Sequence, residues 1–357
     1  MVWVIMAILL AHSETDLVRR FLSSHSRKSK LSRFWLAATY RPGGGTMNQA
    51  EIRETARMVE MAGLSSPMLR VFQVRSDYLL PSTYVIESPS ALKILLRPWI
   101  VGGKLASYAR RSTAEFLRVA YGVSEELRDS HLGTVTEVIP LAGSLYYGVA
   151  EAFESVFGEP INRCFIGAKR QLSPTGWVTE LAYENFEALS PESVILIGDT
   201  IATGGTIERI LDATLARGPD IRAVIVYSIA GGLIGAHRLK QLAERLHIPI
   251  YLFFSNAIFG VESNGTDMPW LHPGTVVSPG IRAKAESTYG TDLGRRWCCV
   301  WDWGDRAKQP LKHLEMLLAR CDEELHANVT EKTKNVLEKV RRETQNALEE
   351  WKKPLQL

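Results

Sequence analysis

SVILIGDTIATGGTI, residues 193–207, is the stretch of sequence that decides the fold. The four apolar residues 194–197 are typical of a buried strand, a turn of small residues follows them, and the chain then enters a helix. Gly204 and Gly205 let the backbone bend so that successive N–H groups face one anion, and the helix adds the positive end of its dipole. This arrangement predicts phosphate binding, so we call residues 198–206 the phosphate loop.

The phosphate loop differs from two common nucleotide-binding motifs. No Lys follows the glycines, as a Walker loop requires, and the spacing is not that of a GxGxxG dinucleotide turn. The plain structural alternative is a Gly-Gly turn between a strand and a helix. An apolar strand that ends in Asp199, seven positions before Thr206, favours a functional loop over that alternative.

Short apolar runs alternate with helical segments on both sides of the loop. The expected strands are 135–141, 163–166, 194–197, 223–229, 248–254 and 298–301, and the expected helices are at about 144–157, 205–216 and 235–246. This alternation predicts an α/β fold with a parallel, doubly wound sheet, which binds ligands at the carboxyl ends of its strands.

Helical patterns also flank the expected sheet. Ile52, Ala56 and Val59 fall on one face of a first helix, and a second amphipathic stretch covers 112–127. From Gln309 onward the chain is helical and mixed in charge, which favours packing on its own domain or on a dimer partner over a separate binding module. We therefore expect N-terminal helices, a domain over 47–310 and a helical extension over 311–357.

Composition separates the first 46 residues from the rest. They contain seven Lys or Arg against Glu14 and Asp16, a net charge of +5, so the remaining chain carries −2 of the total +3. The body thus lacks the basic surface of a nucleic-acid binder, and no nucleic-acid partner is expected. Residues 1–46 are either a basic, disordered leader or untranslated sequence upstream of a true start at Met47.

Two further features bear on the cellular setting. The apolar run of residues 2–10 is too short to cross a bilayer, so no membrane partner is expected. The four cysteines are too few and too irregularly spaced for a disulfide framework or a zinc site. The adjacent Cys298 and Cys299 are interpreted as strand packing, and a reducing, cytoplasmic location is expected.

The phosphate loop resembles the phosphoribosyl pyrophosphate (PRPP) loop of type I phosphoribosyltransferases. In that family the loop holds the 5′-phosphate, and the acids before it hold the ribose hydroxyls beside a magnesium pyrophosphate. Asp199 matches the second acidic position, whereas Gly198 stands at the first. The resemblance implies Mg²⁺ carried by the pyrophosphate of PRPP, with no direct protein ligand. The PRPP-binding residues that it implies here are Asp199, Thr200, Ala202, Thr203, Gly204, Gly205 and Thr206.

Residues 95–310 are similar, more closely, to the uracil phosphoribosyltransferase branch. Residues 140–143 occupy its pyrophosphate-binding turn and imply roles for Ala142 and Gly143. Lys169 and Arg170 lie about 28 residues before the loop, where the family carries an arginine on a flexible hood. Residues 301–306, WDWGDR, resemble the uracil loop. They imply base-binding roles for Trp301, Asp302, Trp303 and Asp305.

Two departures from that branch concern the reacting end. The pyrophosphate turn has Leu141 or Ala142 where the uracil enzymes carry an arginine. Trp301 and Trp303 replace the small residues that flank the matched Asp302. The indoles either fill a uracil-sized pocket, stack on a larger aromatic base, or belong to the core.

The resemblance implies a PRPP-dependent transferase with PRPP and a nucleobase as partners, and we expect a homodimer or higher homo-oligomer. Asp199 and Arg170 are its candidate catalytic residues, because Arg170 can meet pyrophosphate as a bidentate cation. The rival hypothesis is a catalytically weakened PRPP- or nucleotide-binding regulatory protein. Gly198 and the arginine-free turn favour this rival, since both lack charged groups expected at the reacting end.

Overall fold

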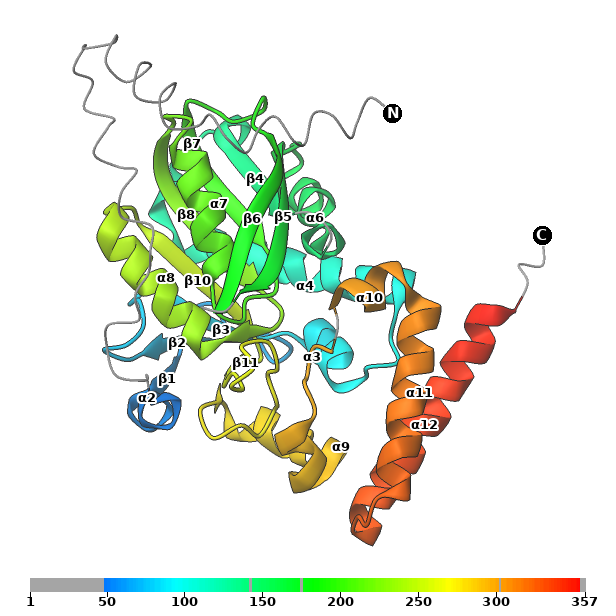
Figure 1. The fold of residues 1–357 in the computed structure, drawn as a ribbon. Coiled ribbons are helices and arrows are strands. Elements are labelled where there is room, and N and C mark those ends of the chain that lie inside the picture. Colours follow the sequence, from blue (N-terminus) through cyan, green and yellow to red (C-terminus); the bar gives the residue numbers. More distant parts are fainter. Residues whose placement is uncertain (1–47, 141–142, 174–175, 302, 354–357) are drawn as a thin grey trace, which may run out of the picture. The chain divides into compact units, whose positions relative to one another are not determined.

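A nine-stranded sheet organises this protein, with the strand order β1-β2-β3-β10-β8-β7-β4-β5-β6 (Figure 1). The structure, a computed structural model, describes residues 48–140, 143–173, 176–301 and 303–353, apart from the side chains of 170, 172, 176 and 177. In sheet order, the strands are β1 (Arg57–Glu60), β2 (Arg70–Arg75), β3 (Thr83–Glu87), β10 (Ile250–Ser255), β8 (Asp220–Ser228), β7 (Glu192–Gly198), β4 (Val135–Pro140), β5 (Asn162–Ser173) and β6 (Gly176–Asn185).

The six strands from β3 to β5 are mutually parallel, and antiparallel strands extend the sheet at both edges. A small second sheet contains β9 (Gly231–Gly232), β11 (Ala257–Phe259) and β12 (Val276–Val277). Every position of β4, and every position of β7 after its first residue, is buried. Strands buried on both faces suit a sheet that helices cover on both sides.

Helices cover the sheet and continue beyond it (Figure 1). They are α2 (Gln49–Thr55), α3 (Pro89–Leu96), α4 (Gly102–Val123), α5 (Glu125–Arg128), α6 (Val149–Phe157), α7 (Gly205–Leu215), α8 (Leu233–Leu246), α9 (Pro279–Arg296), α10 (Trp303–Lys308), α11 (Pro310–His326) and α12 (Glu331–Lys352), with short 3₁₀ turns η2 (Leu132–Thr134) and η3 (Ser144–Tyr147). The expected α/β fold, with a largely parallel sheet and C-terminal helices, is confirmed.

The strand order reverses between β4 and β7. From β4 the chain proceeds through α6 to β5 on one side, whereas from β7 it proceeds through α7 and α8 to β8 and β10 on the other. Right-handed crossovers in opposite directions place their helices on opposite faces of the sheet. The carboxyl ends of β4 and β7 therefore flank a crevice, the usual ligand position in such folds.

Three predictions about local structure are wrong, and one of them is the single helix expected over 144–157, which a left-handed Gly148 divides into η3 and α6. The first helix does not continue to Val59, because Ala56 turns into an extended conformation and β1 pairs with β2 instead. Residues 298–301 do not form a strand; Cys298 makes only an isolated bridge to Pro269. Trp301 has a φ of 54°, which a strand cannot accommodate. All four cysteines are free.

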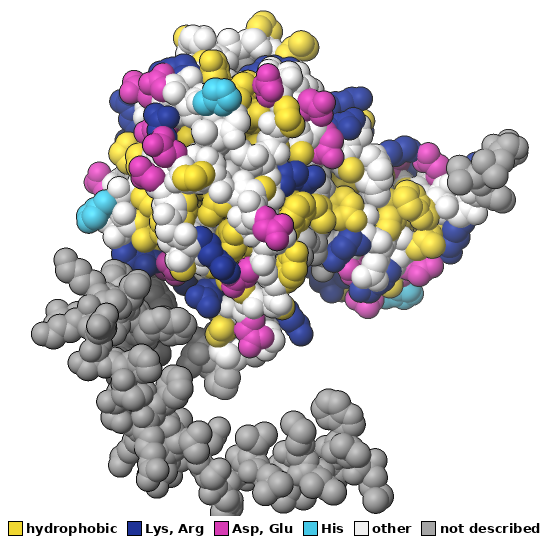
Figure 2. Space-filling view, turned by 90° about the horizontal axis from the view of Figure 1, so that it is seen from above, with side chains coloured by type: hydrophobic (Ala, Val, Ile, Leu, Met, Phe, Trp, Pro, Cys, Tyr) yellow, Lys and Arg dark blue, Asp and Glu magenta, His cyan; other side chains and the backbone are white. Residues whose placement is uncertain are grey.

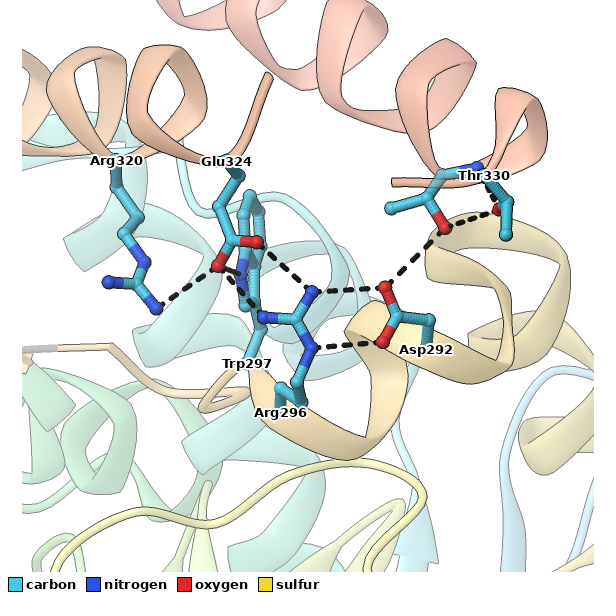
Figure 3. A network of polar contacts seen from close by, with 7 residues as sticks. Asp292, Arg296, Trp297, Arg320, Glu324 and Thr330 are labelled. Atoms are coloured by element: carbon cyan, nitrogen blue, oxygen red, sulfur yellow. Dashed lines mark hydrogen bonds and ion pairs between the residues drawn. The ribbon is translucent and has the colours of Figure 1, made fainter. Parts of the chain in front are cut away.

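The helical extension packs on its own chain. Helices α11 and α12 pack against each other, and α12 packs against α9. A polar cluster centred on Arg296 of α9 joins this helix to α11 (Figure 3). Its guanidinium donates to both oxygens of Asp292, at 2.9 and 3.0 Å, and to both oxygens of Glu324, at 2.9 and 3.0 Å. Arg320 adds a second cation 3.1 Å from Glu324.

This cluster makes the stability dependent on pH. Hydrogen bonds from Arg296 lower the pKa of Glu324 and of Asp292 below their usual values of 4.5 and 3.8. A carboxyl with a lowered folded-state pKa stabilises fully above its unfolded value and loses that contribution as pH falls through the folded one. We expect Arg296→Met to reduce the free energy of unfolding at pH 7 by about 1–2 kcal/mol.

The measurement is urea unfolding of both proteins between pH 7 and pH 3. The difference between wild type and Arg296→Met should shrink as pH falls below about 4.5. Arg295→Met is the matched control, since Arg295 is the exposed neighbour on the same helix. A difference that stays constant across this range would contradict the interpretation.

Candidate functional site

The phosphate loop lines a cavity of about 190 Å³ at the carboxyl end of β7. The lining consists of residues 199–207 together with Pro140 and Ala168. Pro140 is the last residue of β4 and Ala168 lies in β5, so three neighbouring parallel strands contribute. The structure thus brings the predicted loop residues together at the crevice where the strand order reverses.

Local backbone geometry turns the amides of the loop toward an anion. Gly204 precedes α7 with a φ of 78°, a left-handed conformation that glycine adopts without steric cost. A Cβ there would also lie 3.1 Å from the carbonyl oxygen of Gly235. Since Glu208 is the first residue whose N–H reaches Gly204, the amides of Gly205, Thr206 and Ile207 have no partner within the helix. A helix terminus of this kind is suited to binding phosphate.

The neighbouring strands hold the loop in place. The N–H of Ile201 donates to the carbonyl of Ala230, and the carbonyl of Ile201 accepts from Gly232 at 2.6 Å. Asp199 accepts the N–H of Thr200 at 2.8 Å. The two bonds of Ile201 join the loop to the segment after β8 and to β9.

The antiparallel hairpin β5–β6 meets the loop from the other side. The hydroxyl of Thr179, on β6, lies 3.3 Å from that of Thr206. Lys169 is exposed on β5. The backbone of Arg170 pairs with Thr179, while its side chain lies outside the described part of the structure. The hairpin that carries both predicted cations therefore reaches the phosphate loop.

The turn after β4 adjoins Asp199. Leu141 and Ala142 lie outside the described residues. A Cβ on Gly143 would lie 3.9 Å from Oδ1 of Asp199, and the carbonyl of Gly143 accepts the indole N–H of Trp303 at 2.9 Å. The predicted pyrophosphate turn and the predicted ribose-binding acid are thus neighbours.

The residues of the predicted base loop separate into different surroundings. The side chain of Trp303 is buried, with 5% of its surface exposed. Trp301 is only partly buried and packs edge-to-face against Trp297. Asp305 forms an ion pair with Lys312 at 2.7 Å, on the helical extension. Asp302 lies outside the described residues. Among these four residues, Trp303 is the one whose described contacts lead to the phosphate loop, through Gly143.

Sequence reasoning missed two side chains beside the loop. The guanidinium of Arg238, on α8, would lie 3.1 Å from a Cβ on Gly205, and Arg238 forms an ion pair with Glu208 at 2.5 Å. The hydroxyl of Tyr147, in η3, lies 3.3 Å from that of Thr200. Neither residue belongs to a recognisable motif, and only the tertiary structure brings them to the loop.

Among the described residues, charged side chains and those that could bind a metal ion are dispersed. Within the described ranges, no three His, Cys, Asp or Glu side chains are grouped as a metal ion would require. On the face drawn in Figure 2, basic and acidic side chains are interspersed and form no continuous basic area. None of the described helices is both long enough and apolar enough to cross a membrane.

Comparison with known proteins gives structural neighbours. No family model matches the sequence, and no curated protein matches it. Among solved structures, the chain is similar to adenine phosphoribosyltransferase from Trypanosoma brucei, at 16% identity and a TM-score of 0.33, over 57% of this chain and 95% of that one. It is similar to hypoxanthine-guanine phosphoribosyltransferase from L. donovani, at 14% and 0.28, over 47% and 89%. A Neisseria gonorrhoeae protein with bound ppGpp matches at 13% and 0.24, over 36% and 67%.

Proposed function

We propose that this chain binds PRPP in the cavity of the phosphate loop and transfers its ribose 5-phosphate to a nucleobase-like nitrogen, with release of pyrophosphate. One observation carries the proposal: Asp199, Thr206 and the first amides of α7 all line the same cavity. Its position, between the ends of β4 and β7, is where doubly wound sheets bind ligands.

Each part of the cavity has a role in this reaction. The amides of residues 203–206 and the Thr206 hydroxyl bind the 5′-phosphate, and Asp199 orients the ribose. The carbon–oxygen bond to pyrophosphate breaks, with its electron pair leaving on pyrophosphate, as the bond from the acceptor nitrogen forms, and the proton of that nitrogen passes to water. Because the transition state is oxocarbenium-like, the protein mainly positions reactants and stabilises the leaving pyrophosphate.

The turn at Ala142 and Gly143, with Lys169 and Arg170 on the hairpin, receives the pyrophosphate in this proposal. Magnesium bound to PRPP supplies charge neutralisation there. A Mg²⁺ ion held mainly by substrate phosphates needs only one or two protein carboxylates. The lining of the described cavity contains one acid, Asp199, which suits an ion carried by the substrate rather than by a site made of protein ligands.

The acceptor in this proposal is a uracil-like pyrimidine or a related base, held by Trp301, Asp302, Trp303 and Asp305. Three observations favour the rival function, a regulatory protein that binds PRPP or a nucleotide without turnover. Trp303 is almost fully buried, and Asp305 is engaged by Lys312. Position 198, moreover, supplies no acid.

One experiment separates the two functions. The purified full chain is given PRPP, magnesium and a panel of pyrimidine and purine bases, while pyrophosphate release and PRPP binding are both measured. Release that depends on one base supports the transferase. Binding of PRPP without release with any base supports the regulatory protein, and absence of PRPP binding would eliminate both.

The phosphate-binding role of Thr206 is tested by Thr206→Val. This variant keeps the side-chain shape but removes the hydroxyl, so a phosphate oxygen loses one hydrogen bond. We expect PRPP binding to weaken by about 1–3 kcal/mol, as measured by titration calorimetry. Thr288→Val on α9, whose hydroxyl bonds the carbonyl of Lys284, is the matched control. Unchanged affinity in a folded Thr206→Val protein would argue strongly against the loop assignment.

A further inference from the structure

Tyr147 occupies the space beside Gly198. A Cβ added at Gly198 would lie 3.1 Å from both Cβ and Cδ1 of Tyr147 and 3.0 Å from Cγ2 of Val149. These approaches are tighter than ordinary carbon contacts. A carboxylate at this position would need three more heavy atoms beyond that Cβ. A side chain at 198 would therefore crowd both Tyr147 and Val149.

The ring of Tyr147 has neighbours on several sides, so moving it away from position 198 would cost packing energy. Its side chain is fully buried. The ring centroid lies 5.9 Å from that of Tyr227 and 5.3 Å from that of Trp303. The backbone carbonyl of Tyr147 accepts the hydroxyl of Thr113, on α4, at 2.8 Å.

The hydroxyl of Tyr147 connects two strand ends at the phosphate loop. It hydrogen-bonds the hydroxyl of Thr200 at 3.3 Å and accepts the N–H of Ile229, just after β8, at 3.2 Å. Burial, and then the charge of Asp199, raise the pKa of Tyr147. The phenol thus stays neutral beside Asp199.

Building on the proposed PRPP site, we propose that Tyr147 is a positioning residue that replaces a second carboxylate, fixing Thr200 next to Asp199 through its hydroxyl. A ligand in this cavity faces one negative charge fewer than it would with an acid at 198. PRPP is a multiply charged anion, so a neutral phenol removes one source of repulsion at the ribose end.

The first test removes only the hydroxyl. Tyr147→Phe keeps the ring, and the expected result is a fall in PRPP affinity of about 5- to 30-fold by calorimetry. Tyr227→Phe is the matched control: it loses a buried hydroxyl that bonds Ser112 and Ser255, away from the loop. Its PRPP affinity should change less than about twofold, although both variants lose thermal stability. Wild-type affinity in Tyr147→Phe would overturn the positioning role.

The second test does not depend on PRPP. Gly198→Asp, Tyr147→Ala and the double variant are compared by melting temperature in the full chain. We expect the loss in the double variant to be smaller than the two single losses combined, because removal of the ring relieves its Cδ1 contact with the new side chain, while the contacts with the Cβ of residue 147 and with Val149 remain. If Tyr147→Ala alone is unfolded, a folded double variant gives the same support. Losses that simply add, or a double variant that is also unfolded, would overturn the inference.

The two tests distinguish failure of this inference from failure of the proposed function. If wild-type protein binds no PRPP, the proposed function fails, and the melting comparison still decides whether Tyr147 takes the place of an acid. If wild-type protein binds PRPP and the Tyr147→Phe and Tyr227→Phe variants bind it equally well, the inference fails while the proposed function stands.

Discussion

Replacement of Arg306 by Ala is expected to reduce the free energy of unfolding by about 3–5 kcal/mol. Arg306 is completely buried on α10, and its guanidinium donates to the carbonyls of Ile94, Arg97, Ile100 and Val300 at 2.9–3.2 Å. Burial lowers its pKa to about 10, so it remains charged at neutral pH. Without it, the carbonyls of the buried residues Ile94, Ile100 and Val300 lose the donor that the guanidinium supplies.

Urea unfolding followed by circular dichroism measures this loss. Arg342→Ala, which removes an exposed arginine from α12, is the control and should change stability by less than about 0.5 kcal/mol. A loss below about 1 kcal/mol in Arg306→Ala would mean that water or a rearranged loop satisfies the carbonyls. The α3–α4 connection would then not depend on Arg306.

Trp303→Ala is expected to cost about 3–4 kcal/mol of unfolding free energy. The indole is 5% exposed, packs on Tyr147 and donates to the carbonyl of Gly143. Removing it leaves a large cavity next to the phosphate loop, and the carbonyl of Gly143 keeps only the N–H of Tyr146 as a donor. Trp301→Ala is the comparison variant, and since Trp301 is only partly buried, its loss should be smaller.

Acceptor selectivity of Trp303→Ala is measured beside its melting temperature. Turnover of uracil that is absent in the wild type would support a tryptophan that fills the base pocket. Loss of turnover with a larger acceptor would support a tryptophan that stacks on it. A destabilised variant with unaltered selectivity would end the base-site interpretation and leave Trp303 as a core residue.

The sequence predicted the central strands well because their physical signal is local. The run at 194–197 lies inside β7, 223–229 overlaps β8, and 248–254 overlaps β10. Strands buried on both faces are continuously apolar, so their sequences are easily distinguished from those of the neighbouring helices. For the same reason the phosphate loop, which joins β7 to α7 without a break in sequence, could be located before its geometry was known.

Elements whose conformation depends on distant partners were not predictable in this way. The segment 144–157 was expected to be one helix, but Gly148 adopts a left-handed conformation and separates η3 from α6. The edge strands β1 and β2 exist through pairing with each other and with β3. Residues 298–301 are apolar because they pack inward, yet Val300 gives its carbonyl to Arg306 rather than to a strand.

The candidate site shows the same division. Residues 199–206 are consecutive, so their grouping could be read directly. Tyr147 reaches the loop from η3, and Arg238 reaches it from α8. No spacing rule connects positions so far apart, and no single-sequence pattern indicates that Tyr147 fills the space next to Gly198.

The contact between α12 and α4 affects how the chain folds during its synthesis. Trp351 lies against Gly102, where an added Cβ would come within 2.5 Å of the indole, and Lys104 pairs with Glu350 across 246 positions of sequence. A nascent chain on the ribosome presents the start of α4 long before α12 has been translated. Val101, which packs against Leu314 and Leu348, lacks these partners throughout that interval. Closing so long a loop is slow, and chaperones that bind exposed apolar segments can bind the nascent chain during this interval.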